Sequence, residues 1–290
     1  MCRPATLDIG PSAAGNRFAE RAEYPRMDDL ERLADAIRRA DTVVAVTGAG
    51  LSAPSGVPTF RGDDGIWERF DERQVAADRF RRDPAGFWAD RVALERAMFD
   101  EEYEPNVGHQ ALAAMGRDGN LEAILTQNTD GLHGDAVGAG GERPSDGDPD
   151  AETGTTVLEL HGNSRRGRCT DCGTRRDSDP IVERAAAGEL PPTCECGGVF
   201  KPDVVLFGDR LPDAVFQRAR ALARESDAFL AIGSSLVVEP AASLPRLAAS
   251  TGATVAIVNL EPTPCDGIAE TVLREDVTAG LPRLRDLTTA

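Results

Sequence analysis

A glycine-rich run directly after an apolar stretch is the feature that most restricts how this chain can fold. Residues 42–47 read TVVAVT, which is typical of a buried strand, and residues 48–61 continue as GAGLSAPSGVPTFR. Gly48, Gly50 and Ala53 match a G-x-G-x-x-G/A spacing. In that spacing, small residues allow a tight turn, close approach of the backbone to a pyrophosphate, and close packing. The run therefore predicts a pyrophosphate-binding site at the end of the first strand.

The residues after this fingerprint differ from those of an ordinary dinucleotide-binding oxidoreductase. Such an enzyme continues into an amphipathic helix and places an acidic ribose ligand about 20 residues further on. Here Pro54, Gly56 and Pro58 interrupt any helix at once. We therefore expect residues 48–61 to form a loop that covers a bound cofactor.

Strand and helix patterns alternate along the rest of the chain. Further strands are predicted at Ala123–Thr126, Val157–Leu160, Val204–Phe207, Ala228–Ile232 and Thr254–Val258. One helix is predicted to run to about Arg39, with Asp28 or Asp29 as its N-cap. Three more helices are predicted at Asn106–Met115, Asp213–Arg224 and Pro240–Ser250. This alternation favours an α/β fold, a Rossmann-like doubly wound parallel sheet with helices on both faces.

Two interruptions of this pattern predict a smaller second lobe. Residues of about 62–103 have a helical pattern and are expected to form a helical small-lobe segment. Residues of about 165–200 hold four of the six cysteines and little apolar periodicity, which indicates a small inserted zinc-binding module. Both belong to one main domain over 27–290, preceded by a disordered arm over 1–26. A solvated surface loop is expected over 134–154, which is rich in Gly, Asp, Glu and Pro.

Two short-spaced cysteine pairs, Cys169 with Cys172 and Cys194 with Cys196, have the spacing of a tetrahedral zinc site. Disulfides are the alternative, but they are uncommon in the reducing location that we expect. Four thiolates would leave no open position for a substrate, so the zinc would be structural. The second pair is tighter than the usual C-x-x-C.

The charge balance excludes some classes of function. The chain has 49 acidic against 32 basic residues, a formal net charge of −17, and Lys201 as its single lysine. Such a balance is expected for adaptation to high salt, although an acidic protein from a GC-rich genome would also show it. Nucleic-acid binding is disfavoured because it needs a basic surface. No apolar run reaches the roughly 18 residues of a membrane span, and residues 1–26 lack a secretory apolar region, so we expect a cytoplasmic protein.

Six blocks in chain order resemble the motifs of the sirtuin family, the NAD-dependent protein deacylases. They are residues 48–61, 126–133 (TQNTDGLH), 159–162 (ELHG), 201–208 (KPDVVLFG), 233–236 (GSSL) and 258–261 (VNLE). Together they span roughly residues 28–284, with the cysteine pairs in the expected interval. The resemblance implies NAD as co-substrate and one structural Zn²⁺.

The resemblance assigns the chemistry to His161 and Asn128. His161 would be the general base that accepts a proton from a nicotinamide-ribose hydroxyl as it attacks an alkylimidate, and Asn128 would position water or ribose. Gln127 would contact the ribose, and Asp130 would recognise the nicotinamide carboxamide. The other implied cofactor contacts are Gly48, Ala49, Gly50, Ala53, Phe60, Arg61, Gly233, Ser234, Ser235, Asn259, Leu260, Glu261, Asp276 and Val277.

Plainer interpretations of these residues stay open. A lone histidine after a strand is more often structural, and Gln-Asn-Thr-Asp-Gly is also a turn sequence. His133 is expected to pack or hydrogen-bond beneath the loop, and His109 lies on a predicted helix.

An acyl-lysine peptide would lie as an added strand between two segments, according to the same resemblance. The matching residues are Val205, Phe207, Gly208, Leu236 and Val237. Trp88 and Arg91 occupy a region where deacylases of long acidic chains carry Tyr-x-x-Arg. Arg91 would either pair with a succinyl carboxylate or, as we expect, be a solvated helix arginine.

The sequence thus predicts an NAD-dependent protein-lysine deacetylase that releases nicotinamide and O-acetyl-ADP-ribose. A desuccinylase, a protein ADP-ribosyltransferase, a dehydrogenase, and a non-enzymatic zinc and NAD binding module are the alternatives. The expected partners are acyl-lysine proteins or peptides, and neither nucleic acid nor membrane. The sequence leaves the oligomeric state undetermined.

Overall fold

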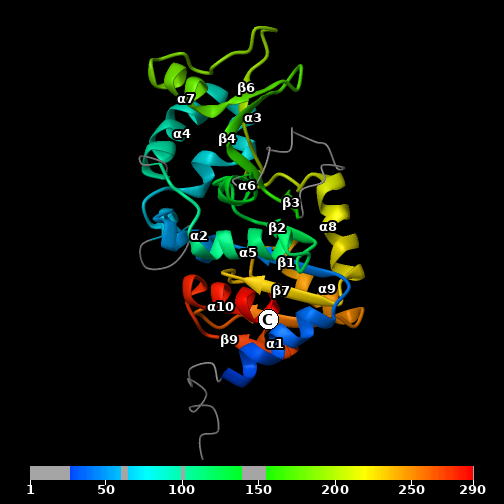
Figure 1. Ribbon diagram of the computed structural model, residues 1–290. Coiled ribbons are helices and arrows are strands. Elements are labelled where there is room, and N and C mark those ends of the chain that lie inside the picture. Colours follow the sequence, from blue (N-terminus) through cyan, green and yellow to red (C-terminus); the bar gives the residue numbers. More distant parts are fainter. Residues whose placement is uncertain (1–26, 60–64, 99–101, 139–154, 290) are drawn as a thin grey trace, which may run out of the picture.

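A six-stranded parallel sheet forms the centre of the main lobe in the computed structural model, which describes residues 27–59, 65–98, 102–138 and 155–289 (Figure 1). Its strands are β1 (Val43–Thr47), β2 (Ala123–Thr126), β3 (Thr156–Glu159), β7 (Ala228–Ile232), β8 (Thr254–Val258) and β9 (Thr271–Leu273). Their order is β3-β2-β1-β7-β8-β9, and every neighbouring pair is parallel. The strand order reverses between β1 and β7, the position at which open α/β sheets bind ligands.

Helices cover both faces of this sheet because alternate strand residues point to opposite sides. On β1, Val43 and Ala45 belong to one apolar core, and Val44 and Val46 belong to another. The first core includes residues of α1 (Met27–Arg39), α5 (Val107–Arg117) and α10 (Val277–Thr289). The second includes residues of α8 (Asp213–Glu225), the 3₁₀ turn η4 (Ala241–Ser243) and α9 (Leu244–Ser250). The prediction of a doubly wound Rossmann-like sheet is confirmed.

A smaller lobe, at the top of Figure 1, combines the two interruptions of the α/β pattern. Its antiparallel sheet has the order β5-β4-β6, with β4 at Gly162–Cys169, β5 at Arg175–Asp177 and β6 at Phe200–Val204. Its helical parts are η2 (Ile66–Glu68), η3 (Glu72–Val75), α3 (Ala77–Arg82), α4 (Pro84–Met98) and α7 (Ser178–Ala186). A third apolar core joins residues from both interruptions, including Phe87 and Trp88 of α4 with Phe200 of β6. The two interruptions therefore pack together.

Several element boundaries differ from the predictions. The strand predicted at Val204–Phe207 is wrong: the chain pairs with β4 over Phe200–Val204, in the small sheet, and leaves that pairing where an apolar run had suggested a strand. α1 begins at Met27, so the predicted N-cap positions 28 and 29 lie inside the helix and not before it. The α6 helix (Leu132–Gly138) occupies the start of the predicted 134–154 loop; residues 139–154 and the predicted arm at 1–26 lie outside the described residues.

The glycine-rich run forms two short turns, α2 (Ala49–Ser52) and η1 (Ala53–Ser55). Pro54 stands at the start of η1, and Gly56 ends it with φ of 92°. The interruption of a longer helix by these residues was predicted correctly. Within the described residues, no helix is long and apolar enough to cross a membrane.

Candidate active site at the carboxyl edge of the sheet

Two glycine turns meet where β1 and β7 end. Gly48 N donates to Ile232 O (3.0 Å) and Gly50 N donates to Gly233 O (2.8 Å). A Cβ on Gly48 would lie 2.8 Å from Gly233 O, and one on Gly233, whose φ is 58°, would lie 2.4 Å from Leu51 N. Because no side chain fits at this crossing, the two turns approach each other through backbone alone.

Polar side chains that follow β2 and β7, the two strands on either side of β1, connect across the same edge. Gln127 follows β2, and its Nε2 donates to Ser234 Oγ after β7 (2.8 Å). Gln127 N also donates to Thr47 O at the end of β1 (2.9 Å). Ser234 is buried and Ser235 is exposed. The predicted residues Gln127 and Ser234 thus lie together over the switch point between β1 and β7.

Asn128 and Asp130 form a buried polar group with Ser52. Asn128 Nδ2 donates to Gly48 O (3.1 Å) and to Ser52 Oγ (2.9 Å). Asp130 Oδ1 accepts from Leu132 N (2.9 Å). Burial raises the pKa of Asp130, while hydrogen bonds from Leu132 and Ser52 act in the opposite direction. Ser52 was not predicted as a site residue, although it lies inside the 48–61 block.

His161 follows β3 in an orientation that suits a base. Its Nδ1 lies 3.0 Å from the carbonyl oxygen of Gln127. A carbonyl only accepts, so Nδ1 carries the proton and Nε2 keeps its lone pair in the neutral ring. Burial lowers the pKa of His161, and the hydrogen bond to Gln127 partly opposes that shift. The ring is therefore neutral at pH 7 and able to accept a proton.

Two further histidines lie beneath the glycine loop. His133 Nε2 is 2.9 Å from Thr47 Oγ1, and His109 Nε2 is 3.4 Å from Ser52 Oγ. Their rings meet edge to face with centroids 5.0 Å apart. Burial lowers the pKa of His109 to about 4 and the pKa of His133 well below its usual value. Both are uncharged packing groups at neutral pH, as expected for His133.

The third predicted cofactor group surrounds the ends of β8 and β9. Asn259 Nδ2 donates to Glu261 O (2.7 Å), and Leu260 between them is exposed. Asp276 Oδ1 accepts from Thr278 N (2.7 Å) in the first turn of α10, and Val277 is buried. The structure therefore brings these residues to the same edge as Gly48 and Gly233. Of the other predicted contacts, Ala49 and Ala53 lie in the glycine loop, while Phe60 and Arg61 are outside the described residues.

The predicted peptide-binding residues lie on two segments, one after β6 of the smaller lobe and one after β7 of the main sheet. Val205 N donates to His161 O (2.9 Å), so this segment runs directly beside the histidine. Phe207 and Val237 are exposed apolar side chains, and Phe207 packs edge to face on Trp67 with centroids 5.2 Å apart. Leu236 has φ of 52°, a conformation that L residues rarely adopt and that is found at functional sites.

The four predicted metal ligands gather at the end of the small sheet. The Sγ atoms of Cys169, Cys172, Cys194 and Cys196 all lie within 4.8 Å of one another. Tetrahedral zinc with Zn–S bonds of about 2.3 Å requires sulfur separations of about 3.8 Å. The distances from Cys169 to Cys196 (3.5 Å) and from Cys172 to Cys194 (3.8 Å) are near that value and too long for a disulfide. All cysteines of the described residues are free thiols, and these four fit a zinc ion.

Arg91 is not the solvated arginine that the sequence predicted. It is buried, and its Nε donates to Glu95 Oε1 (2.7 Å) one turn further along α4. Trp88 is buried in the third core, and its Nε1 donates to Phe200 O (2.7 Å). The error arose because charge alone does not reveal burial when a partner lies one helical turn away.

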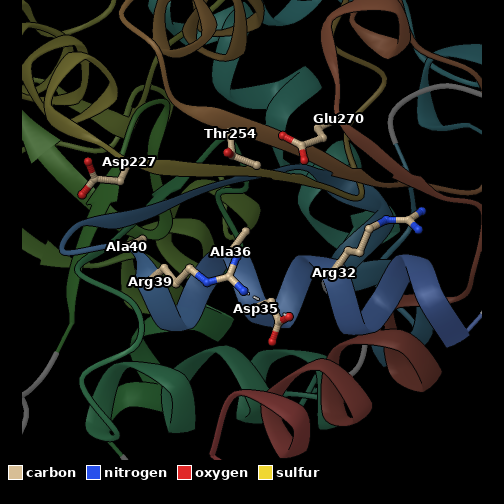
Figure 2. Close-up of a pocket in the computed structure, with 8 residues that line it drawn as sticks. All are labelled: Arg32, Asp35, Ala36, Arg39, Ala40, Asp227, Thr254 and Glu270. Carbon is tan, nitrogen blue, oxygen red and sulfur yellow. Dashed lines mark hydrogen bonds and ion pairs between the residues drawn. The ribbon is translucent and has the colours of Figure 1, made fainter.

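A hollow of about 370 Å³ lies at the opposite, amino edge of the sheet (Figure 2). Its lining residues are Arg32, Asp35, Ala36, Arg39, Ala40, Asp227, Thr254 and Glu270. Asp227 Oδ2 accepts from the backbone N–H groups of Asp41 (3.0 Å) and Thr42 (2.9 Å), which fixes the entry to β1. This hollow is separate from the candidate site, because Asp227 and Thr254 stand where β7 and β8 begin.

The fold, the glycine crossing and the four-cysteine lobe define a recognised class of protein: this chain belongs to the Sir2 family, whose family model matches residues 48–240. It is 52% identical over 259 residues to an NAD-dependent protein deacetylase of Haloarcula marismortui, with 89% of this chain and 94% of that protein covered. A solved structure described as "Structural Basis for the Mechanism and Regulation of Sir2 Enzymes" superposes with a TM-score of 0.74 at 37% identity, covering 91% of this chain and 99% of that one. Another, "Sir2-p53 peptide-NAD+", superposes with a TM-score of 0.74 at 30% identity, covering 89% and 97%.

Proposed function

We propose that this protein is an NAD-dependent protein-lysine deacetylase that releases nicotinamide and O-acetyl-ADP-ribose. The observation that carries the proposal is the geometry of His161, a neutral imidazole whose Nδ1 is held by the carbonyl of Gln127, the residue next to the buried Asn128. Membership of the Sir2 family and the names of the relatives support NAD dependence and protein substrates.

NAD would lie along the carboxyl edge of the sheet. Its pyrophosphate would face the backbone at Gly48, Gly50 and Gly233, where a side chain has no room. Gln127 and Ser234 would contact a ribose, and Asn259 with Asp276 would lie at the adenosine end. Asp130 would accept hydrogen bonds from the nicotinamide carboxamide, because it is a buried acceptor directly beneath the loop.

The residues would divide the reaction between positioning and proton transfer. Cleavage of the glycosidic bond develops positive charge at the ribose carbon, and fixed polar groups in a pocket that excludes water lower that barrier. Asn128, held by Gly48 O and Ser52, would position the ribose or the attacking water. His161 would then take the proton of the ribose hydroxyl on Nε2, while the Gln127 carbonyl stabilises the imidazolium through Nδ1.

Acetyl is the favoured acyl group because the cation that would select an acidic chain is already paired. Arg91 is buried against Glu95, and Trp88 uses its Nε1 on Phe200 O. Burial of an unpaired carboxylate in that region would cost several kcal/mol (roughly 2–5). A neutral, short acyl group therefore fits this lobe better than succinyl.

The four cysteines would hold one structural zinc. With four sulfur ligands the ion has no open position, so it would order the small lobe and take no part in acyl transfer. Metal analysis of the purified protein should give one zinc per chain, and substitution of Cys172 and Cys196 by serine should remove it.

The deciding experiment incubates the protein in concentrated KCl with NAD and two peptides, one acetylated and one succinylated on lysine. Peptide masses, nicotinamide and the intact protein mass are followed together, with His161→Ala as the control. Loss of acetyl that requires both NAD and His161 supports the proposal. Selective loss of succinyl would instead identify a desuccinylase, and ADP-ribose added to protein with intact peptides would identify an ADP-ribosyltransferase.

A further inference from the structure

The single lysine of the chain lies in the strand that leads into the segment proposed to bind the peptide. All other Lys and Arg residues of the chain are arginines, so Lys201 is its single primary-amine side chain. It is part of β6, which ends at Val204, immediately before Val205, Phe207 and Gly208.

Lys201 connects the two ends of this segment. Its Nζ donates to Val204 O (2.9 Å) and forms an ion pair with Asp209 Oδ2 (3.2 Å). The other carboxylate oxygen of Asp209 is 3.3 Å from Arg81 Nη1 on α3. One ammonium group therefore contacts the residue at which the strand ends and the residue that follows Gly208, while Arg81 ties the same carboxylate to the helical part of the lobe.

The segment between these contacts is held by few backbone interactions. Val205 N donates to His161 O, Ala77 N donates to Phe207 O (3.0 Å), and Asp209 N donates to Leu206 O (2.9 Å). Gly208 has φ of 86°, so the chain turns sharply just before Asp209. Phe207 is exposed on this short stretch, outside any strand. Its shape therefore depends on the contacts at its ends.

The ion pairs of Lys201 and Asp209 are half-buried, and such pairs contribute little to global stability. They should instead fix the local shape of the segment, because one ammonium group is bound to Val204 O and to the Asp209 carboxylate. A compact ammonium with three donors can bond both acceptors at once, whereas a guanidinium presents its donors in a plane at the end of a longer side chain.

We propose that Lys201 is a positioning residue that holds residues 204–209 in the form to which the acyl-lysine peptide adds as a strand. The inference rests on the proposed function of Val205, Phe207 and Gly208 as peptide-binding residues. It assigns to the lysine a role in peptide affinity, and none in NAD binding or proton transfer.

Lys201→Gln tests this role, since glutamine keeps much of the side-chain length and loses the charge. We expect the KM for an acetyl-lysine peptide to rise about fivefold, the effect of losing one charge-assisted hydrogen bond. The KM for NAD should change less than about twofold, and Tm should be nearly unchanged. Lys201→Arg keeps the charge but replaces the compact ammonium by a planar guanidinium, so it should recover only part of the peptide affinity.

Asp209→Asn provides the partner test. It should raise the peptide KM similarly, and the double variant K201Q/D209N should show less than the sum of the two effects because the residues act as one unit. Arg82→Gln is the matched control, as it breaks a surface ion pair with Asp78 on the same helix as Arg81 without touching the segment.

Peptide affinity is also measured by fluorescence anisotropy, so the inference is decided independently of turnover. If Lys201→Gln binds the peptide as tightly as the wild type does, the positioning role is overturned. It is also overturned if the KM for the peptide and the KM for NAD rise equally and Tm falls. If the wild type turns over no acyl peptide, the proposed function fails instead, and the anisotropy series still decides what Lys201 does.

Discussion

His161 shows how one backbone contact can prepare a side chain for chemistry. The Gln127 carbonyl fixes the tautomer, and burial lowers the pKa of the ring. A base must be unprotonated to act, so a lowered pKa increases the fraction of competent enzyme at neutral pH. The same contact would stabilise the imidazolium after proton transfer.

The pH dependence of turnover tests this assignment. We expect kcat to stay level from pH 8 to pH 7 and to fall on a single limb whose midpoint lies below pH 6.5, because protonation of His161 removes the base. His161→Ala should lower kcat by about 10²–10⁴-fold. A loss of activity between pH 8 and pH 7 in the wild type would contradict the lowered pKa.

His109 gives a second prediction, on stability. Its pKa is lowered to about 4 in the folded protein, and the unfolded value is about 6.5. The unfolded state therefore binds more protons between these values, so stability is complete above pH 6.5 and falls as pH decreases toward 4. At pH 5 His109 should reduce the free energy of unfolding by about 2 kcal/mol.

Denaturant unfolding at pH 7.5 and pH 5 measures that loss, with His109→Gln as the comparison. Glutamine does not titrate, so the variant should lose less stability than the wild type over the same interval. Equal losses in the two proteins would show that His109 is not responsible.

At the scale of elements, the crossing of the glycine turns is the most demanding local structure. Gly233→Ala combines an unfavourable φ with a Cβ 2.4 Å from Leu51 N, so the α2 turn must move. We expect a loss of about 1–3 kcal/mol in the free energy of unfolding. NAD affinity should fall by at least about tenfold, since the displaced backbone is the proposed pyrophosphate contact.

Gly267→Ala is the matched control for this change, because a Cβ at Gly267 meets nothing within 4 Å. Urea unfolding and calorimetric titration with NAD should find it close to the wild type. Normal NAD affinity in Gly233→Ala would remove the crossing from the cofactor site.

The buried strands could be predicted from the sequence because long apolar runs have few alternatives. Ala228–Ile232 and Thr254–Val258 form strands with the predicted bounds. β9 has three residues, too few for a detectable pattern, and its place depends on pairing with β8. Val204–Phe207 misled the prediction because an apolar run fits both a buried strand and a partly exposed segment beside a core.

The site was predictable where short motifs specify geometry, and less so where distant residues meet. The glycine spacing predicted a tight turn after the first strand, and the cysteine pairs predicted a metal site. The structure brings the residues of each motif together. The contact of Ser52 with Asn128 and the ion pair of Arg91 with Glu95 could be found only from the folded structure. The sequence does not show that Ser52 and Arg91 are buried. The roles of the site residues stay predictions.

For the whole molecule, the net charge of −17 dominates the behaviour expected in solution. Self-repulsion of this size destabilises a compact state at low ionic strength. The Debye length falls from about 10 Å at 0.1 M to about 3 Å at 1 M salt, which screens that repulsion. We propose that the protein is adapted to concentrated salt, in keeping with its similarity to a relative from Haloarcula marismortui.

Thermal unfolding in KCl tests the proposal. Tm should rise by at least about 5 °C between 0.1 M and 2 M KCl, equivalent to about 2 kcal/mol for a protein of this size. Most of the rise should occur below 1 M, where screening changes fastest, and NaCl should act similarly. A Tm that does not depend on KCl would contradict the proposal.

The retention of a single lysine has a further consequence for a protein-lysine deacetylase. Lys201 is paired with Asp209, and no other lysine side chain exists in the sequence to carry an acyl group. One copy of the enzyme therefore presents only a single lysine that another copy could deacylate. Acyl donors that modify other proteins in the same cell would have one side-chain amine to reach here, and that amine is the one proposed to shape the peptide-binding segment.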